Sequence, residues 1–271
     1  MTIDASMGRM PNDDNSPGGI STRLAMPSDD SADAPRPNDY DGFAEVYSSE
    51  NEVNFHNAYY ERPAMLALAG EVAGRRILDV GCGSGPLFAA LRDRGAIMTG
   101  FDKSAAMLEL ARRRLGDDAD LQVADLGSPL PFPDSTFDDV IASLVLHYLE
   151  DWAPPLAELR RVLKPGGRLI ASVNHPIAGH PLVRPGADYF ATYQWSYEIT
   201  TSSGQSYVLA NWHRPLPAMI DAFTASGFRI AAISEPPPAP DTPRELLPAS
   251  LQDMPPGSGF LCFMFFVLQA D

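Results

Sequence analysis

The stretch Arg76-Ile77-Leu78-Asp79-Val80-Gly81-Cys82-Gly83-Ser84-Gly85-Pro86-Leu87 decides the fold. Its first half is a short aliphatic run that carries an acid, three alternating glycines follow, and a helical pattern begins at its end. Such a run predicts a buried strand, a tight turn and the start of a helix. Open α/β sheets hold nucleotides with this unit, because glycine adopts backbone angles closed to other residues and leaves room for a ligand against the backbone.

The glycine spacing points to one family of proteins. Dinucleotide-binding folds use Gly-x-Gly-x-x-Gly, whereas this chain has Gly81-x-Gly83-x-Gly85 after Asp79. The run resembles motif I of class I S-adenosylmethionine-dependent methyltransferases, in which the acid meets the methionine end of the cofactor. The resemblance implies that Asp79, Gly81, Cys82, Gly83 and Gly85 bind S-adenosylmethionine. The structural alternative is a glycine-rich turn with no ligand.

Length and composition limit the function further. The chain has 271 residues, enough for one large α/β domain with an appendage, and a net charge of −15 that argues against a nucleic-acid partner. We find no apolar stretch long enough to span a membrane, and the first residues do not resemble a secretion signal, so we expect a cytoplasmic protein. The two cysteines, Cys82 and Cys262, predict neither a disulfide framework nor a metal site.

The N-terminal part changes character near residue 39. Residues 1–38 are rich in Pro, Gly, Ser, Asp and Asn, which predicts a mobile acidic tail. The alternative is a segment that becomes ordered over a partner or ligand. Residues 39–72 are rich in aromatic side chains and predict helices that either bury these rings at the sheet edge or form a lid over the active site. Candidate substrate contacts in this lid are Tyr47, Tyr59 and Tyr60.

The second and third predicted strands also end in acids. Residues 97–102 end at Asp102, about 20 residues past the glycine turn, where a carboxylate of a nucleotide-binding fold reaches ribose hydroxyls. The alternative role of Asp102 is the N-cap of the helix that begins near Ser104. After the third strand, residues 121–124, the resemblance implies that Asp125 contacts the exocyclic amine of adenine. It implies further that Leu126, the stem of Lys103 and Met107 flank the ring.

Two more strands extend the resemblance. A fourth strand ends at Ser143, a candidate cofactor contact, and the family places the cofactor's sulfonium and the substrate beside residues 144–149. Leu163-Lys164-Pro165-Gly166-Gly167 before a fifth strand is another motif of the family. The resemblance covers residues 73–173 and is greatest to the bacterial quinone-biosynthesis methyltransferases. It implies an α/β fold, a seven-stranded doubly wound Rossmann-like sheet whose last strand is antiparallel, within a methyltransferase domain of residues 73–271.

Residues 175–215 are too long for a plain connection after the fifth strand. Two aromatic stretches, residues 189–198 and 207–212, flank Ser202-Ser203-Gly204-Gln205 and predict a β-hairpin. Inserted here, the hairpin would cap the carboxyl ends of the strands, where open sheets bind ligands. Tyr193, Trp195 and Trp212 are therefore candidate substrate contacts, with mutual packing as the alternative. Beyond the cap we expect a helix over 216–226 and strands over 228–234 and 260–268.

Methyl transfer from a sulfonium requires alignment, exclusion of water and, for some acceptors, removal of a proton. The sequence shows no metal-ligand cluster, and the chemistry needs none. Candidate catalytic residues are His147 with Tyr148, and His175. His147 has an equal alternative as a polar wall residue or adenosine contact. Acids such as Glu61 and Glu198 near an aromatic pocket would also stabilise a carbocation.

These observations predict a methyltransferase that acts on a small aromatic or heterocyclic metabolite at O, N or C, as a monomer or homodimer. Two alternatives remain. The chain could bind the cofactor but catalyse a cyclisation, or it could be a non-catalytic scaffold subunit.

Overall fold

The computed structural model describes residues 21–25, for which it gives the backbone, and residues 37–178, 186–200 and 204–271. Its centre is a seven-stranded sheet in the order β4-β3-β2-β5-β6-β10-β9, in which only β10 runs antiparallel to its neighbours. The predicted sheet, with its antiparallel last strand, is confirmed. The strands are β2 (Arg76–Val80), β3 (Ile97–Asp102), β4 (Asp120–Val123), β5 (Phe137–Ser143), β6 (Leu163–Asn174), β9 (Phe228–Ser234) and β10 (Phe263–Ala270).

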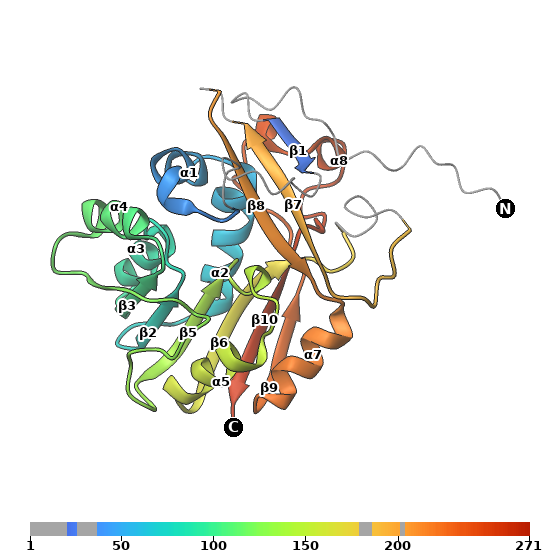
Figure 1. The fold of residues 1–271 in the computed structure, drawn as a ribbon. Coiled ribbons are helices and arrows are strands. Elements are labelled where there is room, and N and C mark those ends of the chain that lie inside the picture. The colour runs from blue at the N-terminus through green and yellow to red at the C-terminus, as the bar shows by residue number, and fades with distance from the viewer. Residues whose placement is uncertain (1–20, 26–36, 179–185, 201–203) are drawn as a thin grey trace, which may run out of the picture.

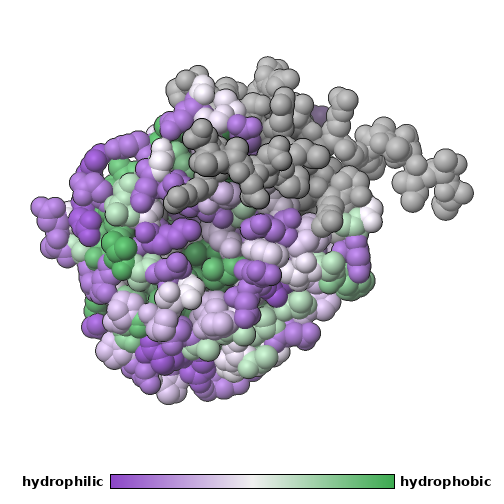
Figure 2. All heavy atoms as spheres, in the orientation of Figure 1, coloured by the Kyte–Doolittle hydropathy of each residue, from purple (hydrophilic) through white to green (hydrophobic). Residues whose placement is uncertain are grey.

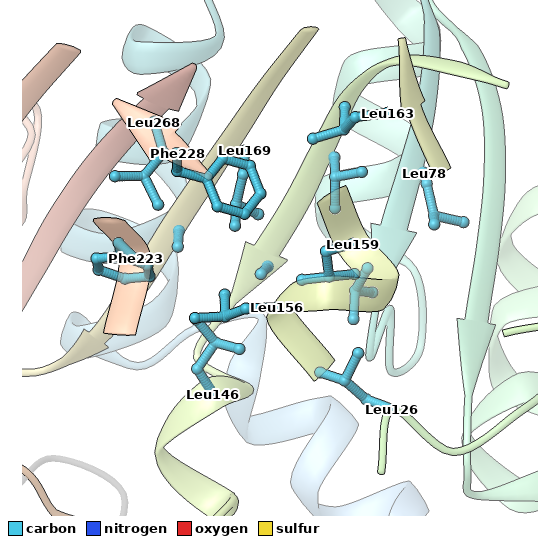
Figure 3. Packing of buried hydrophobic residues seen from close by; sticks show 14 of the residues in the cluster. Leu78, Leu126, Leu146, Leu156, Leu159, Leu163, Leu169, Phe223, Phe228 and Leu268 are labelled. Atoms are coloured by element: carbon cyan, nitrogen blue, oxygen red, sulfur yellow. The ribbon is translucent and has the colours of Figure 1, made fainter. Parts of the chain in front are cut away.

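Helices cover both faces of this sheet because the strands are apolar on both sides (Figure 1). On one face, α5 (Ala153–Val162) and α7 (Leu216–Ala225) bury Leu156, Leu159 and Phe223 against the sheet (Figure 3). On the other, α2 (Arg62–Ala69), α3 (Pro86–Asp93) and α4 (Ala105–Leu115) pack on a second apolar cluster. The sheet is therefore covered on both faces, and the predicted site lies at its carboxyl edge.

A smaller sheet stands beyond this carboxyl edge (Figure 1). It contains β1 (Ser21–Ala25), β7 (Tyr193–Thr200) and β8 (Ser206–His213) in the order β1-β7-β8. The predicted hairpin is present as β7 and β8, while residues 201–203 of its turn lie outside the described part. The prediction of a tail without structure is wrong at Ser21–Ala25, whose backbone pairs antiparallel with β7. The rest of that tail, up to residue 36, lies outside the described residues.

The segment before the first sheet strand is helical, as predicted. It contains η2 (Tyr40–Gly42), α1 (Ala44–Asn51) and η3 (Phe55–Glu61), which is a π-helix. Its start is bonded to the N-terminus of α4, where the Asp41 carboxylate accepts from Ser104 Oγ at 2.6 Å and from the Ala106 amide at 3.0 Å. Ser48 Oγ donates to Ser84 Oγ in the glycine turn at 2.8 Å. The helical segment thus lies across the turn.

Three short elements complete the described chain: η4 (Leu146–Tyr148), η5 (Arg244–Leu246) and α8 (Ala249–Gln252). The face in Figure 2 is mostly hydrophilic, with hydrophobic residues in small groups. No helix in the described ranges is both long and apolar enough to cross a bilayer. Within the same ranges, no three His, Cys, Asp or Glu side chains are grouped so that they would hold a metal ion.

Candidate active site

The three glycines of the turn have different surroundings. Gly81, Gly83 and Gly85 all have positive φ, at 67°, 54° and 79°. A Cβ on Gly81 would lie 2.9 Å from Val145 Cγ2, and one on Gly85 would lie 2.9 Å from Leu115 Cδ1. A Cβ on Gly83 would meet nothing within 4 Å. Gly81 and Gly85 therefore allow close packing, whereas Gly83 leaves open space beside the turn, where a ligand fits.

Two backbone amides of the turn donate hydrogen bonds to the next strand. The Cys82 amide donates to the Phe101 carbonyl and the Gly83 amide donates to Asp102 Oδ2, both at 2.9 Å. Cys82 is buried, and burial raises the pKa of its thiol well above the usual value, so it stays protonated. The structure thus brings the predicted cofactor residues of β2 and β3 together at one edge.

Asp102 does not cap α4. Its Oδ1 accepts from the Ser104 amide at 2.9 Å, but the N-cap is Ser104, whose Oγ accepts from the Met107 amide at 3.0 Å. Each carboxylate oxygen can accept two hydrogen bonds, so Asp102 keeps acceptor capacity for ribose hydroxyls. The cap alternative is therefore wrong, and the ribose contact remains a prediction that this geometry favours.

The predicted adenine contacts are less uniform. Asp125 follows β4 at the same sheet edge, is exposed, and accepts the Gly127 amide at 2.8 Å. Met107 is buried beside this edge and Lys103 is exposed. Leu126 belongs to the core under α5 (Figure 3), so its predicted contact with the adenine ring is not favoured. These four residues remain predictions, with Asp125 and Met107 in the more suitable places.

Asp79 is the most unusual acid in the site. It is 2% exposed, and its Oδ2 has no hydrogen-bond partner among the residues that the structure describes. Burial first, and then the nearby charges of Glu61 and Asp102, raise the pKa of Asp79 to about 7. An unpaired buried carboxylate is costly, so this position is suited to a ligand with a positive charge.

Ser143 is not free to bind the cofactor by itself. Its Oγ donates to Glu61 Oε1 at 2.7 Å, and Ser172 Oγ donates to the same oxygen at 2.7 Å. Glu61 is 3% exposed and lies at the end of the π-helix η3. After Ser143 the backbone turns sharply, since Leu144 has a φ of 49°. The sequence suggested Glu61 only as an acid near an aromatic pocket, and the structure shows it bonded to two strands of the sheet.

The catalytic candidates after β5 are buried and uncharged. His147 is 6% exposed, its Nδ1 has no partner in the described ranges, and burial lowers its pKa to about 3. The Tyr148 hydroxyl lies 2.6 Å from the Tyr40 hydroxyl, and burial raises its pKa well above the usual value. A neutral imidazole and a protonated phenol suit hydrogen bonding better than proton abstraction near pH 7.

His175 is occupied by structural contacts. Its Nε2 lies 2.9 Å from Glu235 Oε1, and its Nδ1 accepts from the amides of Ile177 and Ala178, each at 3.2 Å. Both ring nitrogens therefore make contacts that stabilise the backbone just after β6. The prediction that His175 removes a substrate proton does not agree with this geometry.

The lid tyrosines separate into two groups. Tyr47 lies edge-on to Tyr40, with ring centroids 5.0 Å apart, and burial, followed by the charges of Glu61 and Asp102, raises its pKa. Tyr60 is fully buried and its hydroxyl donates to the Phe260 carbonyl at 2.7 Å, so as a substrate contact it is a wrong prediction. Tyr59 is half-buried at the margin of the same apolar cluster and is poorly placed.

The hairpin presents its aromatic residues on two faces. Trp195 pairs with Asn211 and Tyr197 with Leu209, and Leu209 and Tyr197 pack toward α1. Trp212 pairs with Gln194, one residue out of step, so it points to the opposite face. Tyr193 stacks on His213 with ring centroids 4.8 Å apart. The structure therefore places Tyr193 and Trp195 on the inward face and contradicts the prediction for Trp212.

Asn211 is a candidate that sequence reasoning missed. It is 1% exposed, and among the described residues neither polar atom of its side chain makes a hydrogen bond of good geometry. Burial raises the pKa of Tyr197, and Asn211 lies close enough to that hydroxyl to offset part of the rise. Its strand, β8, packs against η4, which carries His147. In the sequence, Asn211 lies two residues after Leu209, which places both side chains on one face of an aromatic strand. This alternation is the signal that indicates a buried position for Asn211.

Comparisons with known proteins agree with this geometry. Residues 78–171 match the family model described as a methyltransferase domain. The chain is 37% identical over 198 residues to a demethylmenaquinone methyltransferase of Clavibacter sepedonicus, covering 70% of this chain and 79% of that protein. The chain belongs to the class I S-adenosylmethionine-dependent methyltransferases. Within this class, the chain is similar to enzymes of the quinone-biosynthesis group.

Two further relatives give the range of this likeness. A demethylmenaquinone methyltransferase of Tropheryma whipplei is 35% identical over 135 residues, covering 49% of this chain and 56% of that protein, so the chain spans about half of that relative's length. The structure of an S-adenosylmethionine-dependent methyltransferase from Mesorhizobium loti has a TM-score of 0.59 and 30% identity, covering 76% of this chain and 96% of that one.

The residues present fit the cofactor of this family. S-adenosylmethionine is cationic at its methionine end, and the unpaired buried Oδ2 of Asp79 suits that charge. The open space beside Gly83 and the spare acceptor capacity of Asp102 suit the nucleoside. The cofactor supplies an activated methyl group, and the protein holds, orients and shields it.

Proposed function

We propose that this methyltransferase transfers the methyl group to a small aromatic acceptor whose ring carries hydroxyl or carbonyl oxygens. The observation that carries the proposal is a pair of buried, poorly satisfied polar groups beside a cluster of tyrosines. Among the described residues His147 Nδ1 has no hydrogen-bond partner, and the Asn211 amide makes no hydrogen bond of good geometry, although Tyr197 lies close to it. Buried polar groups are normally bonded, so each of them is suited to a polar atom of a ligand.

The tyrosine cluster supports an aromatic acceptor. Tyr40, Tyr47 and Tyr148 are in ring contact or hydrogen-bonded, and burial raises the pKa of Tyr148, so its hydroxyl stays protonated. Aromatic rings pack well against a flat ring, and their protonated hydroxyls donate to its oxygens. The names of the demethylmenaquinone methyltransferases agree with such an acceptor, without fixing which one this chain uses.

The chain's own residues have modest chemical tasks in this reaction. Methyl transfer is an in-line displacement, so most of the rate enhancement comes from alignment and exclusion of water. His147, neutral because of its burial, accepts a hydrogen bond from an acceptor hydroxyl through Nδ1 and thereby orients the ring. Asn211 offers both a donor and an acceptor to a second oxygen. The helical segment over residues 39–72 and the hairpin exclude water as lid and cap.

The proposal is tested with S-adenosylmethionine carrying a labelled methyl group. The protein is incubated with phenols, 1,4-benzohydroquinone and 1,4-naphthohydroquinone, and matched non-aromatic diols serve as controls. We expect label in an aromatic product, and a KM for that acceptor that rises roughly tenfold in Asn211→Ala, the change expected for one lost hydrogen bond to a buried polar group. Label in no aromatic product, from a protein that binds S-adenosylhomocysteine, contradicts the proposal. An altered product without label favours the cyclase alternative instead.

A further inference from the structure

Glu61 connects the N-terminal helical segment to the carboxyl edge of the sheet. It is the last residue of the π-helix η3, and such helices occur often at functional sites. Its Oε1 accepts one hydrogen bond from Ser143 on β5 and one from Ser172 on β6, each 2.7 Å long. Both serine bonds go to one oxygen. The side chain is 3% exposed, so its charge lies inside the protein.

The strand register places Asp79 on the same face as this cluster. Asp79 on β2 is the partner of Ile141 on β5, and Ser143 lies two residues further along β5. Ser143 is in turn the partner of Ser172. Alternate residues of a strand, and directly paired residues of neighbouring strands, share a face. The Asp79 carboxylate and the serines that hold Glu61 are therefore neighbours on one face at the carboxyl edge.

The charges around this pair do not balance. The negative charge of Glu61 contributes to the raised pKa of Asp79, and burial raises the pKa of Glu61 itself. Arg62 is the cation that acts on Glu61, but its guanidinium donates to Asn51 and lies 3.6 Å from Glu52. Asp79 Oδ2, buried and without a partner in the described part of the chain, completes a site that needs a positive charge.

We infer that Glu61 and Asp79 together form a cation site that favours the charged, methyl-bearing cofactor over its product. The cofactor has two positive charges, the ammonium and the sulfonium, and the product keeps only the ammonium, since its sulfur is a neutral thioether. Asp79 suits the ammonium. Glu61 supplies the second negative charge, which is useful only while the sulfur is positive. After transfer the sulfur is neutral and its attraction to Glu61 is lost. The product therefore binds less tightly than the cofactor.

This inference rests on the cofactor of the family and not on the aromatic acceptor. It can therefore fail while the proposed acceptor is right, and the acceptor can be wrong while the inference holds. Calorimetry without any acceptor separates the two cases.

The experiment titrates three ligands into each protein: S-adenosylmethionine, S-adenosylhomocysteine, and sinefungin, in which a charged amine stands at the place of the methylated sulfur. The variant is Glu61→Gln, which keeps an acceptor oxygen for both serines. The control is Glu245→Gln, which removes the same charge from an exposed residue of η5 that has no part in the proposed site. Circular dichroism melting verifies that each variant is folded.

We expect the ratio of the S-adenosylhomocysteine Kd to the S-adenosylmethionine Kd to fall roughly tenfold in Glu61→Gln. Sinefungin should follow the charged cofactor, and the ratio should be unchanged in Glu245→Gln. An unchanged ratio of the two Kd values in folded Glu61→Gln overturns the inference. This holds also if the variant loses turnover, because Glu61 would then act on the methyl acceptor and not on the cofactor. If Glu61→Gln does not fold, the wild type decides: sinefungin must bind more tightly than S-adenosylhomocysteine, and equal or weaker binding overturns the inference.

Discussion

At the scale of single residues, buried charge determines what the site can hold. Most polar groups in a protein interior are bonded, and a buried unpaired carboxylate costs several kcal/mol unless it is protonated or meets a cation. Asp79 is such a carboxylate, with its pKa raised to about 7 by burial and by Glu61 and Asp102. The free site therefore stores part of a proton at neutral pH, which a cationic ligand displaces.

Cofactor binding should release protons near neutral pH. A bound cation favours ionised Asp79 and lowers its pKa, so at pH 7, where about half of the free groups are protonated, binding releases about 0.5 proton per site. The release should shrink as pH rises to 9, since Asp79 is then already ionised. Calorimetry in buffers of different ionisation enthalpy measures it. Asp79→Asn should abolish most of the release at pH 7, and a release that grows with pH would contradict this account.

The sequence predicts some of these residues better than others. Asp79 and Asp102 follow from their places at strand ends, because the carboxyl ends of parallel strands meet at one edge. Asn211 could not be chosen in advance, because its role depends on which hairpin face turns inward, and Trp212 was misplaced for the same reason. The Tyr60 hydroxyl bonds to a carbonyl 200 residues away, which no local pattern reveals.

At the scale of the elements, the glycine turn combines packing with open space. Gly81 and Gly85 lie against side chains from distant elements, while Gly83 has nothing where its Cβ would be. Its amide is nevertheless fixed by Asp102. A ligand against this turn therefore approaches the backbone at Gly83.

Alanine at Gly83 should separate folding from binding. Gly83→Ala should lower the free energy of unfolding by only about 1–2 kcal/mol, the usual cost of a positive φ at a residue with a Cβ. Its methyl group should reduce affinity for S-adenosylhomocysteine by roughly tenfold or more, because it occupies the ligand's space. Gly74→Ala is the matched control, since Gly74 also has a positive φ and open surroundings but precedes the amino end of β2. Equal affinities in the two variants would place the ligand elsewhere.

The elements themselves follow well from the sequence where a pattern repeats. The sheet strands and α3, α4 and α7 lie close to the predicted positions, because apolar periodicity reports which face is buried. Two strand starts differ: β6 begins at Leu163, before the predicted glycine turn, and β10 begins at Phe263 and not at residue 260. The strand Ser21–Ala25 does not, because five residues in a polar, proline-rich context form a strand only when β7 offers its edge. Tertiary pairing decides such a segment.

At the scale of the whole molecule, the helical segment before the sheet lies across the cofactor turn. Its contacts there include the Asp41 carboxylate at the start of α4, the Ser48 hydroxyl on Ser84, and ion pairs from Glu45 to Arg113 and from Glu52 to Arg114. Most of these groups are partly or fully exposed, so each contributes little and the set can open. We expect this segment to act as a lid that opens when the cofactor exchanges.

Weakening one attachment should speed exchange without unfolding the protein. Ser104 Oγ and the Ala106 amide donate hydrogen bonds to the Asp41 carboxylate and hold its pKa below the usual value. Asp41→Asn removes this negative charge and so weakens both hydrogen bonds. We expect S-adenosylhomocysteine to dissociate about two- to threefold faster, as for the loss of one exposed contact, and amides of residues 40–51 to exchange hydrogen faster. Asp93→Asn, which removes an exposed charge at the end of α3, should change neither. Unchanged exchange in Asp41→Asn would show that the segment is not a lid.

Cofactor binding at the carboxyl edge of β2 and β3 is tested most directly by titrating S-adenosylhomocysteine into the wild type and Asp102→Ala. We predict saturable binding to the wild type and a loss of about 1.5–3 kcal/mol in the folded variant, the value of hydrogen bonds to a charged group. Asp102→Asn should lie between them, because its amide oxygen still accepts one of the two backbone amides. Equal affinity in wild type and folded Asp102→Ala would contradict the account.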